Sequence, residues 1–499
     1  MGESLATFTP AEKERYEGYV NETLNSRQQI MGWIDKVPMD GGGTISTQNT
    51  GTTGVTTQRA VHFVAHVGRN ATGGFQDPEG NFPTAGNQSY VQGYVQGRSL
   101  VWPCNVSRAI IARTRTDDAA YARAMVESAV RTGNDIRNHE EFLLMGDGSC
   151  TLGTVGGAST LASNQITIPL DNFQDLRKFF VGQIIQVFSS RIAGATLRTP
   201  ISTGTGSPTT ALKVVGLTIS TSAPAVITGA VNGGTITAQN ALSAGDVISK
   251  ASLDLSVATP TQNGERTASL RLGIMGIDGV VLDCDSPMET SNGLYGILAP
   301  SQYGTGTVNG QGLSGTANAA GIPQWASFVN RAANNRALND SILQSIIDMP
   351  MISYGERPNL ITTSYGGRWE FANSKLGIRR YVNTTEISGS TGGGFKEDEA
   401  AKHFPSYDDI PIVPSRFAQT WNFQQGGTLS TNIYALNLNV LKFFEWHPVR
   451  IMDDDGLTWR MIQRTPFFEC IFEHCIELMT YARNAHAKAI NVTASDAGV

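Results

Sequence analysis

Two β-rich runs with a polar turn between them, within residues 58–115, restrict the possible folds of this chain more than any other feature. Apolar residues alternate with more polar ones in the outgoing run, at Val61, Phe63, Ala65 and Val67. The turn signal Asp77-Pro78-Glu79-Gly80 follows, and the chain returns through β-rich residues 90–102. The pattern predicts a β-hairpin too long, with a tip too polar, to pack on one small core. Two interpretations remain open: a floppy surface loop, or an arm that reaches a neighbouring subunit.

The clearest helix follows this hairpin, over residues 116–145. Thr116 is a favourable N-cap, and Asp117 and Asp118 place negative charge in the first turn, where the helix dipole favours it. Charged residues of alternating sign recur every four positions, at Arg123, Glu127, Arg131 and Asp135. Apolar residues at helical spacing occupy another face, and the glycine-rich run 146–149 ends the helix. The sequence therefore predicts a long amphipathic helix with a solvated stripe of ion pairs.

Charged residues make up only 16% of the 499 residues, against roughly 25% in ordinary soluble chains. Such a low charge content in a long chain indicates that much of its surface is buried by obligate assembly, because the interfaces of obligate assemblies are large and apolar. The net charge of −6 provides no general positive field for phosphates. The composition therefore argues against a dedicated nucleic-acid-binding protein.

The compartment can also be inferred from the sequence. The N-terminal residues lack the features of a signal peptide, and no apolar run approaches the roughly 18 residues of a membrane-spanning helix. Five scattered cysteines fit a reducing compartment better than a disulfide framework. We therefore expect synthesis and assembly in a cytoplasm, with no membrane partner.

The remaining residues predict a mixed α+β fold. Residues 1–57 hold a short charged helical stretch and then a polar, glycine-rich run, which is typical of an extended arm ordered only against another surface. Residues 151–270 hold short β-like runs separated by turns, which predicts a small β-barrel or sandwich inserted in the fold. After a connection with a glycine-rich loop at 271–324, the pattern predicts helices at 324–349 and 365–376, and strands at 359–363, 410–414, 432–438, 441–444 and 467–478.

No arrangement of residues indicates catalysis. The chain has no nucleophile elbow, no phosphate-binding loop ending in Gly-Lys-Ser/Thr and no dinucleotide-binding fingerprint in a strand–helix context. His139-Glu140 begins like a zinc-protease helix, but leucine stands where the second histidine is needed, so we interpret the pair as part of the helix's polar face. Cys470, His474 and Cys475 resemble zinc ligands, but Cys475 falls on the other face of a strand, which favours ordinary packing. We predict no catalytic, cofactor or metal site.

The order of these parts resembles the major capsid proteins of tailed bacteriophages, which have the Hong Kong 97 type of fold. Three stretches carry local similarity: residues 137–149 at the end of the long helix, 180–183 with 244–248 in the β insertion, and 410–414 with 433–437 in the returning strands. The resemblance implies an N-terminal arm, an extended loop, a spine helix in a peripheral domain, an inserted β-rich domain with peripheral-domain strands, a connection, an axial domain, and the remaining axial and returning peripheral strands. Their respective ranges are 1–57, 58–115, 116–150, 151–270, 271–324, 325–400 and 401–499.

The resemblance implies a structural protein that assembles through pentamers and hexamers into an icosahedral shell around double-stranded DNA, which it contacts non-specifically. The implied partners are other copies of the chain, a separate scaffold protein, a portal and decoration proteins. Assembly is expected in the cytoplasm of a bacterial host, and the final location is the virion. Some family members cross-link their shells through a lysine of the extended loop, but residues 58–105 contain none, so we expect a non-covalent shell. About 58 residues precede the hairpin, too few for a fused scaffold.

The contact expected between subunits lies at the tip of the extended loop, at Phe75, Asp77, Pro78 and Phe82. Two alternatives remain open. One is another virion or surface-array protein built from β modules. The other is an enzyme whose site is assembled from scattered residues, which would require a concave pocket with convergent titratable groups.

Overall fold

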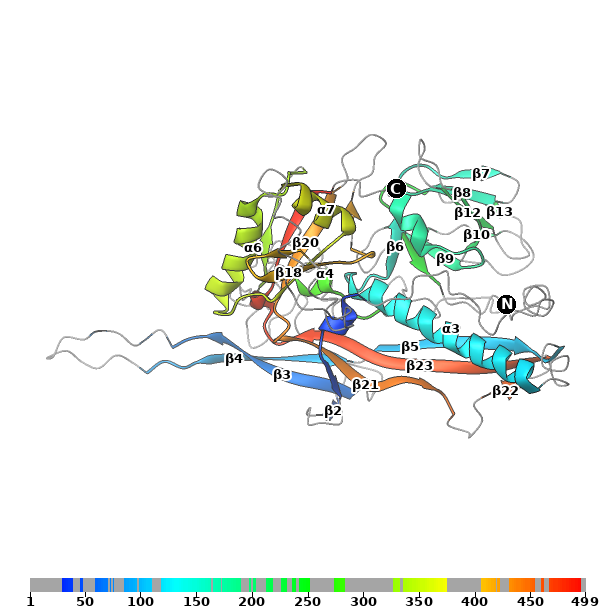
Figure 1. The fold of residues 1–499 in the computed structure, drawn as a ribbon, viewed down its shortest axis with the longest axis horizontal. Coiled ribbons are helices and arrows are strands. Elements are labelled where there is room, and N and C mark those ends of the chain that lie inside the picture. The colour runs from blue at the N-terminus through cyan, green and yellow to red at the C-terminus, as the bar shows by residue number, and fades with distance from the viewer. Residues whose placement is uncertain are drawn as a thin grey trace, which may run out of the picture.

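Figure 1 shows a computed structural model in which a long sheet lies beneath two lobes and a hairpin projects from one end of that sheet. The structure describes residues 29–38, 45–47, 59–70, 72, 75, 85–96, 98–109, 118–162, 165–171, 173–189, 197–198, 201–202, 212–218, 226–230, 236–238, 242–251, 273–282, 326–332, 335–374, 405–418, 420–421, 430–453, 459–461 and 466–494. The helical stretch expected before residue 29, the N-cap at Thr116 and the glycine-rich loop within 271–324 lie outside these residues.

The long sheet is organised around β23 (Phe467–Thr480). One side of β23 pairs antiparallel with β21 (Leu441–Ile451) and β22 (Arg460–Met461), and the other side with β5 (Arg98–Ser107). β1 (Lys36–Pro38) pairs in parallel with β21. Helix α3 (Asp118–Leu144) runs along this sheet (Figure 1), and every second residue of β23 from Cys470 to Ile476 is buried. This alternation is the period of a strand with one covered face, and the predicted long helix is confirmed.

The projecting hairpin consists of β3 (Arg59–Gly68) and β4 (Ser89–Gln96), which pair antiparallel. The short strand β2 (Ile45–Thr47) pairs with the start of β3. The predicted hairpin is therefore confirmed, but its return strand is shorter than expected. Residues from Arg98 onward leave the hairpin and pair with β23, because β23 offers them an edge of ten consecutive residue pairs.

One of the two lobes, formed by strands β6 to β14, is a small barrel, which is one of the two forms that the β-rich pattern predicted. Its strands follow the order β6-β14-β9-β11-β12-β8, with β7 outside β8. The amide of Gly156 donates to the carbonyl of Pro169 and the amide of Asp171 to that of Thr154, both at 2.9 Å, and these bonds close β8 against β6. A Cβ on Gly156 would lie 2.8 Å from the Asp171 backbone, so closure requires glycine there. The bounds are β6 Thr151–Thr154, β7 Thr160–Ala162, β8 Gln165–Pro169, β9 Ile184–Phe188, β11 Leu212–Thr218, β12 Val226–Ala230 and β14 Val247–Lys250; β10 (Ile201–Ser202) pairs with β13 (Ile236–Ala238).

The other lobe, which we call the two-helix lobe, consists of a further seven-stranded sheet and two helices. Its strands follow the order β15-β24-β20-β16-β18-β17, with β19 beside β20. Helices α6 (Asp340–Ser353) and α7 (Tyr365–Ser374) pack on it, and a cluster that includes Ile346 and Ile347 of α6 and Phe371 of α7 is buried between them. The bounds are β15 Phe328–Asn330, β16 Leu360–Thr363, β17 Ser406–Tyr407, β18 Ile410–Pro414, β19 Thr420–Trp421, β20 Ser430–Leu436 and β24 Ala487–Thr493.

The prediction of a helix at 324–349 is wrong for the first half of that range. Residues Phe328–Asn330 are extended and pair in parallel with β24, and α6 begins only at Asp340. Asn339 caps this helix, since its Oδ1 accepts the amide of Ile342 at 2.9 Å. A strand-pairing partner from the end of the chain thus overrides the local helical pattern.

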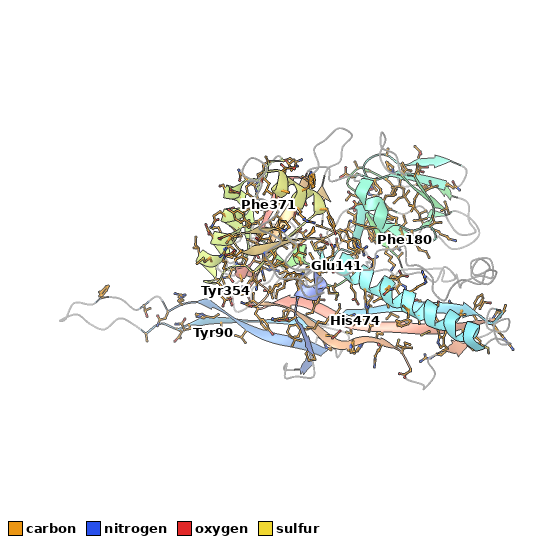
Figure 2. All side chains as sticks on the ribbon, in the orientation of Figure 1. Tyr90, Glu141, Phe180, Tyr354, Phe371 and His474 are labelled. Carbon is orange, nitrogen blue, oxygen red and sulfur yellow. The ribbon has the colours of Figure 1, made fainter. Side chains whose placement is uncertain are left out.

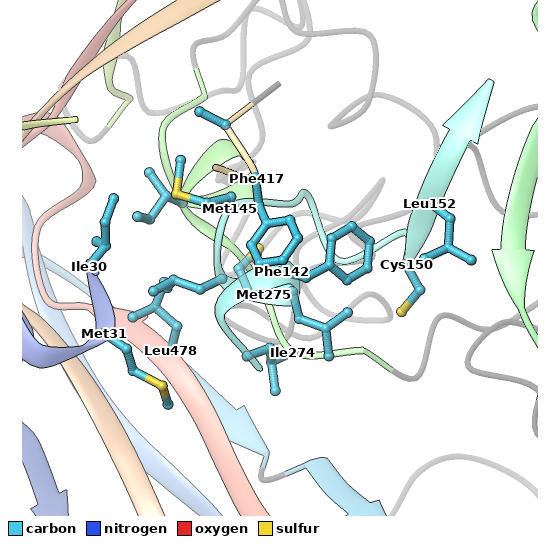
Figure 3. Close-up of a cluster of buried hydrophobic side chains, with 14 of the residues drawn as sticks. Ile30, Met31, Phe142, Met145, Cys150, Leu152, Ile274, Met275, Phe417 and Leu478 are labelled. Carbon is cyan, nitrogen blue, oxygen red and sulfur yellow. The ribbon is translucent and has the colours of Figure 1, made fainter. Parts of the chain in front are cut away.

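The main core lies where the long sheet, the end of α3, the barrel and the short helix α4 (Ile277–Val280) meet. Figure 3 shows Ile30 and Met31 of the N-terminal segment close to Leu478 of β23 and to the end of α3. Among the described residues, no helix is long and apolar enough to cross a membrane. The mixed α+β class is confirmed, and the N-terminal segment from Gln29 to Pro38 lies on the chain's own body.

Candidate functional site

The hairpin exposes apolar and aromatic side chains to solvent. Val64 is 66% exposed, Tyr90 is 59% exposed, and Phe75 near the tip is completely exposed. Local contacts order the polar residues: His66 Nε2 lies 2.7 Å from Gln88 Oε1, and the His66 and Tyr90 rings stand 5.1 Å apart. The hairpin is therefore a projection on which Val64, Phe75 and Tyr90 are largely exposed to solvent.

The register of the hairpin assigns residues to its two faces. Val61 lies opposite Val95, and Ala65 lies opposite Val91. Because successive strand positions alternate between faces, these four positions belong to one face of the ribbon. The outer edge of β4 pairs with no described strand. A two-stranded ribbon is marginally stable in water, and an unpaired edge is a template for another strand.

The predicted contact and ion-pair residues are only partly described. Of the expected tip contacts, Phe75 is described and exposed, whereas Asp77, Pro78 and Phe82 lie outside the described residues. Of the expected stripe on α3, Arg131 is half-buried and Asp135 exposed. The side chains of Arg123 and Glu127 lie outside those described, so the stripe and the tip contact remain predictions.

The polar residues near the end of α3 are buried, which corrects the sequence interpretation. His139 and Glu140, which were expected on the polar face of the helix, are less than a tenth exposed, and so is their neighbour Glu141. The His139 ring lies 5.4 Å from that of Trp102 in β5. Here α3 is covered by the N-terminal segment and the long sheet, so each buried polar group needs a partner. No spacing rule in the sequence signals this, because the partners come from distant parts of the chain.

Glu141 binds the backbone of the N-terminal segment. Its carboxylate accepts the amides of Gln29 at 3.3 Å, Ile30 at 3.0 Å and Met31 at 3.1 Å. Burial raises the pKa of Glu141, and these three hydrogen bonds and the charge of Arg416 oppose that rise without cancelling it. One side chain thus satisfies three backbone donors that precede or open the 3-10 helix Met31–Trp33.

His474 is part of the long sheet (Figure 2), and its side chain lies between two carboxylates. Its Nδ1 is bonded to Glu140 of α3, and its Nε2 lies 2.9 Å from Oε1 of Glu445 in β21. Lys36 of β1 lies 3.3 Å from the same Glu445 oxygen. Burial acts to lower the pKa of His474, but the hydrogen bonds and charges of its carboxylate partners outweigh burial and leave that pKa raised. From the sequence, His474 was expected in ordinary strand packing rather than in a zinc site, and its two carboxylate partners were not predicted.

A second buried junction joins α4 to the two-helix lobe. Asp278 Oδ1 accepts hydrogen bonds from the Tyr434 hydroxyl at 2.9 Å and from Lys488 Nζ at 3.0 Å. Burial, followed by the charge of Asp278, raises the pKa of Tyr434 well above its usual value. These contacts connect β20 and β24 of that lobe to α4.

The described residues also contain no cluster of three His, Cys, Asp or Glu side chains able to hold a metal ion. Cys470 is paired in register with Cys104 of β5, and Cys475 is half-buried on the other face of β23.

Comparison with known proteins gives structural neighbours only. No family model and no curated protein matches the sequence. A chain of the Cyanophage A-1(L) capsid asymmetric unit is 9% identical, with 98% of this chain and 99% of that chain covered and a TM-score of 0.46. A chain from the capsid of the native GTA particle is 8% identical, with coverage of 98% and 100% and a TM-score of 0.39. A chain of Mycobacterium phage Bobi is 7% identical, with coverage of 99% for both and a TM-score of 0.40.

The first two of these neighbours are chains of capsids. All three TM-scores lie below 0.5. The function proposed below therefore depends on the geometry of this chain.

Proposed function

We propose that this chain is the major capsid protein of a tailed bacteriophage. Its copies assemble through pentamers and hexamers into an icosahedral shell that encloses double-stranded DNA. The N-terminal segment, the hairpin, α3, the barrel and the two-helix lobe correspond to the arm, extended loop, spine helix, inserted domain and axial domain of the Hong Kong 97 type.

The projecting hairpin is the observation that carries this proposal. It extends beyond the rest of the molecule (Figure 1), with Val64, Phe75 and Tyr90 exposed and one strand edge unpaired among the described residues. A second copy of the chain can cover these groups and gain both apolar burial and backbone hydrogen bonds. The low charge content of the whole chain, 16%, supports extensive contact between copies.

We expect the copies in the shell to be held together without covalent bonds. Residues 58–105 contain no lysine, so the loop has no amine for an amide cross-link. We expect a separate scaffold protein, a portal and decoration proteins as partners, non-specific contact with packaged DNA, and assembly in the cytoplasm of the bacterial host before the protein is found in the virion.

The test compares the wild-type chain with a shortened hairpin. The variant joins Ala65 to Val91, which lie opposite each other, by an Asn-Gly turn. Negative-stain microscopy after size-exclusion chromatography should show closed shells, or rings of five and six copies, for the wild type only. Equal circular dichroism spectra would establish that the variant is folded.

A matched pair of point variants refines this test. Phe75→Ser removes an exposed apolar side chain from the hairpin, and Val181→Ser removes one, 67% exposed, from the barrel. We expect Phe75→Ser to reduce the yield of assemblies more than Val181→Ser does. Normal assembly of the shortened variant would contradict the proposal.

A further inference from the structure

Residues 29–38 are attached to the body at both ends. At the first end, Glu141 accepts three consecutive amides, from Gln29 to Met31. At the second end, β1 pairs with β21, and the amide of Phe443 donates to the carbonyl of Asp35 at 2.9 Å. The next described strand, β2, pairs with β3 of the hairpin. Residues 29–38 therefore lie on the long sheet, and the next described residues, 45–47, lie on the hairpin.

Charged groups from four elements converge beneath this segment. His474 of β23 contacts Glu140 of α3 and Glu445 of β21, and Glu445 also pairs with Lys36 of β1. The His474 side chain is 1% exposed and that of Glu140 is 3% exposed. On the remaining neighbour, β5, the residue opposite His474 is Leu100, which carries no charge. Arg416 is the cation that acts on the adjacent Glu141.

We propose that Glu140, Glu141 and His474 form a pH-sensitive latch on residues 29–38, closed while His474 is positively charged and loosened when alkaline solution removes that charge. A neutral imidazole has one N–H, so it can donate to only one of its two carboxylate partners. Glu445 would keep Lys36, but Glu140 would face a neutral ring inside the protein. An unpaired buried charge is strongly unfavourable. Glu141, which binds the amides of residues 29–31, lies in the same helix turn as Glu140, so a shift of Glu140 also affects this anchor.

The signs of the pKa shifts agree with loosening at high pH. The raised pKa of His474 means that its contribution is complete below the ordinary value of 6.5 and is lost as pH rises through the higher folded-state value. The raised pKa of Glu141 acts in the same direction. The pKa of Glu445 is lowered: burial acts to raise it, but hydrogen bonds and charges from His474 and Lys36 outweigh burial, so its contribution is lost only in acid. Of these three groups, His474 has the highest ordinary pKa, 6.5, so we expect it to carry the response above that pH.

Hydrogen exchange on the purified full-length chain tests the latch. Protection factors, corrected for the intrinsic effect of pH, would be measured by mass spectrometry at pH 6.5 and 8.5 for peptides covering residues 29–38. We expect protection there to fall, by up to about tenfold for each pH unit over which the linked proton is released. Peptides from β20, which is buried along its length, should keep their protection. Equal protection of residues 29–38 at both values, or a parallel fall in β20, would overturn the proposal.

Variants separate the latch from general loosening. His474→Gln should give low protection of residues 29–38 at both pH values and no pH response. Glu473→Gln is the matched control, since Glu473 precedes His474 on the same strand but faces His447 and Arg450, and it should behave as the wild type. If His474→Gln does not fold, Glu445→Gln, which removes one of the two carboxylates, should reduce the pH response. A retained response in the folded His474→Gln or in Glu445→Gln, or its loss in Glu473→Gln, would refute the latch.

Discussion

Lys488 and Asp278 form an ion pair inside the protein, with Lys488 Nζ 3.0 Å from Asp278 Oδ1 and both side chains less than a tenth exposed. Lys488 also donates to the backbone carbonyl of Asp278, at 3.3 Å. The pair ties β24, near the end of the chain, to the short helix α4 beside the main core. Both charges have partners, so the arrangement is sensitive to the loss of either one.

Replacement of the lysine alone should be strongly destabilising. Lys488→Met removes the positive charge and leaves the Asp278 carboxylate buried, where it still accepts the Tyr434 hydroxyl. Breaking a buried pair in this way typically costs about 3–5 kcal/mol. Urea unfolding of the unassembled chain, followed by circular dichroism, measures this change. The double variant Lys488→Met/Asp278→Asn should lose less than the sum of the single variants, and additive losses would contradict direct coupling.

His486 should make the protein less stable in acid. Burial, then the charge of Arg483, lowers its pKa from 6.5 to about 3, and its Nδ1 accepts the amide of Asn437 at 3.1 Å. A lowered histidine pKa contributes stability above 6.5 and loses it as pH falls toward 3, by up to about 1.4 kcal/mol per pH unit. Melting temperatures between pH 7 and 5 should therefore decrease, and His486→Gln should flatten that part of the profile while lowering its maximum.

Gly276→Ala should prevent correct packing of α4 against the end of α3. A Cβ at residue 276 would lie 2.1 Å from the carbonyl oxygen of Gly146, and backbone atoms on both sides restrict relief. We expect a loss of more than about 2 kcal/mol, in the range of overpacked core sites. Gly32→Ala is the control because a Cβ there meets nothing within 4 Å. Equal urea midpoints for the two variants would contradict the close approach.

Cys470 should react slowly with alkylating reagents while the chain is folded. Burial, with smaller effects from Cys104 and Glu469, raises the pKa of its thiol from 9.0 to about 11. At pH 8 the thiolate fraction falls about 100-fold, since each pKa unit is a factor of ten and the thiolate is the nucleophile. Iodoacetamide labelling followed by peptide mapping should show modification of Cys470 mainly after addition of urea. Rapid labelling of the native chain would refute this.

The hairpin and the long helix could be predicted because their signals are local. The alternation of apolar and more polar residues from Val61 to Val67 indicates the two faces of one strand. The spacing of apolar residues after Thr116 indicates one helix. The same reasoning found β18 with its observed bounds, Ile410–Pro414, and the barrel as a series of short strands. It failed at 324–349, where β15 depends on β24, which lies near the end of the chain.

The sequence by itself therefore determined the order of elements, the mixed α+β class and the resemblance to phage capsid proteins, because periodicity and turn residues act over a few positions. Only the tertiary structure decided which strands pair and which polar residues are buried. In the sequence, nothing distinguishes Glu141 from its helix neighbours, and its role depends on contact with the amides of Gln29 to Met31. The two carboxylate partners of His474 likewise come from other elements, α3 and β21. Such partners are distant in the chain, and burial makes each of these polar groups depend on finding them.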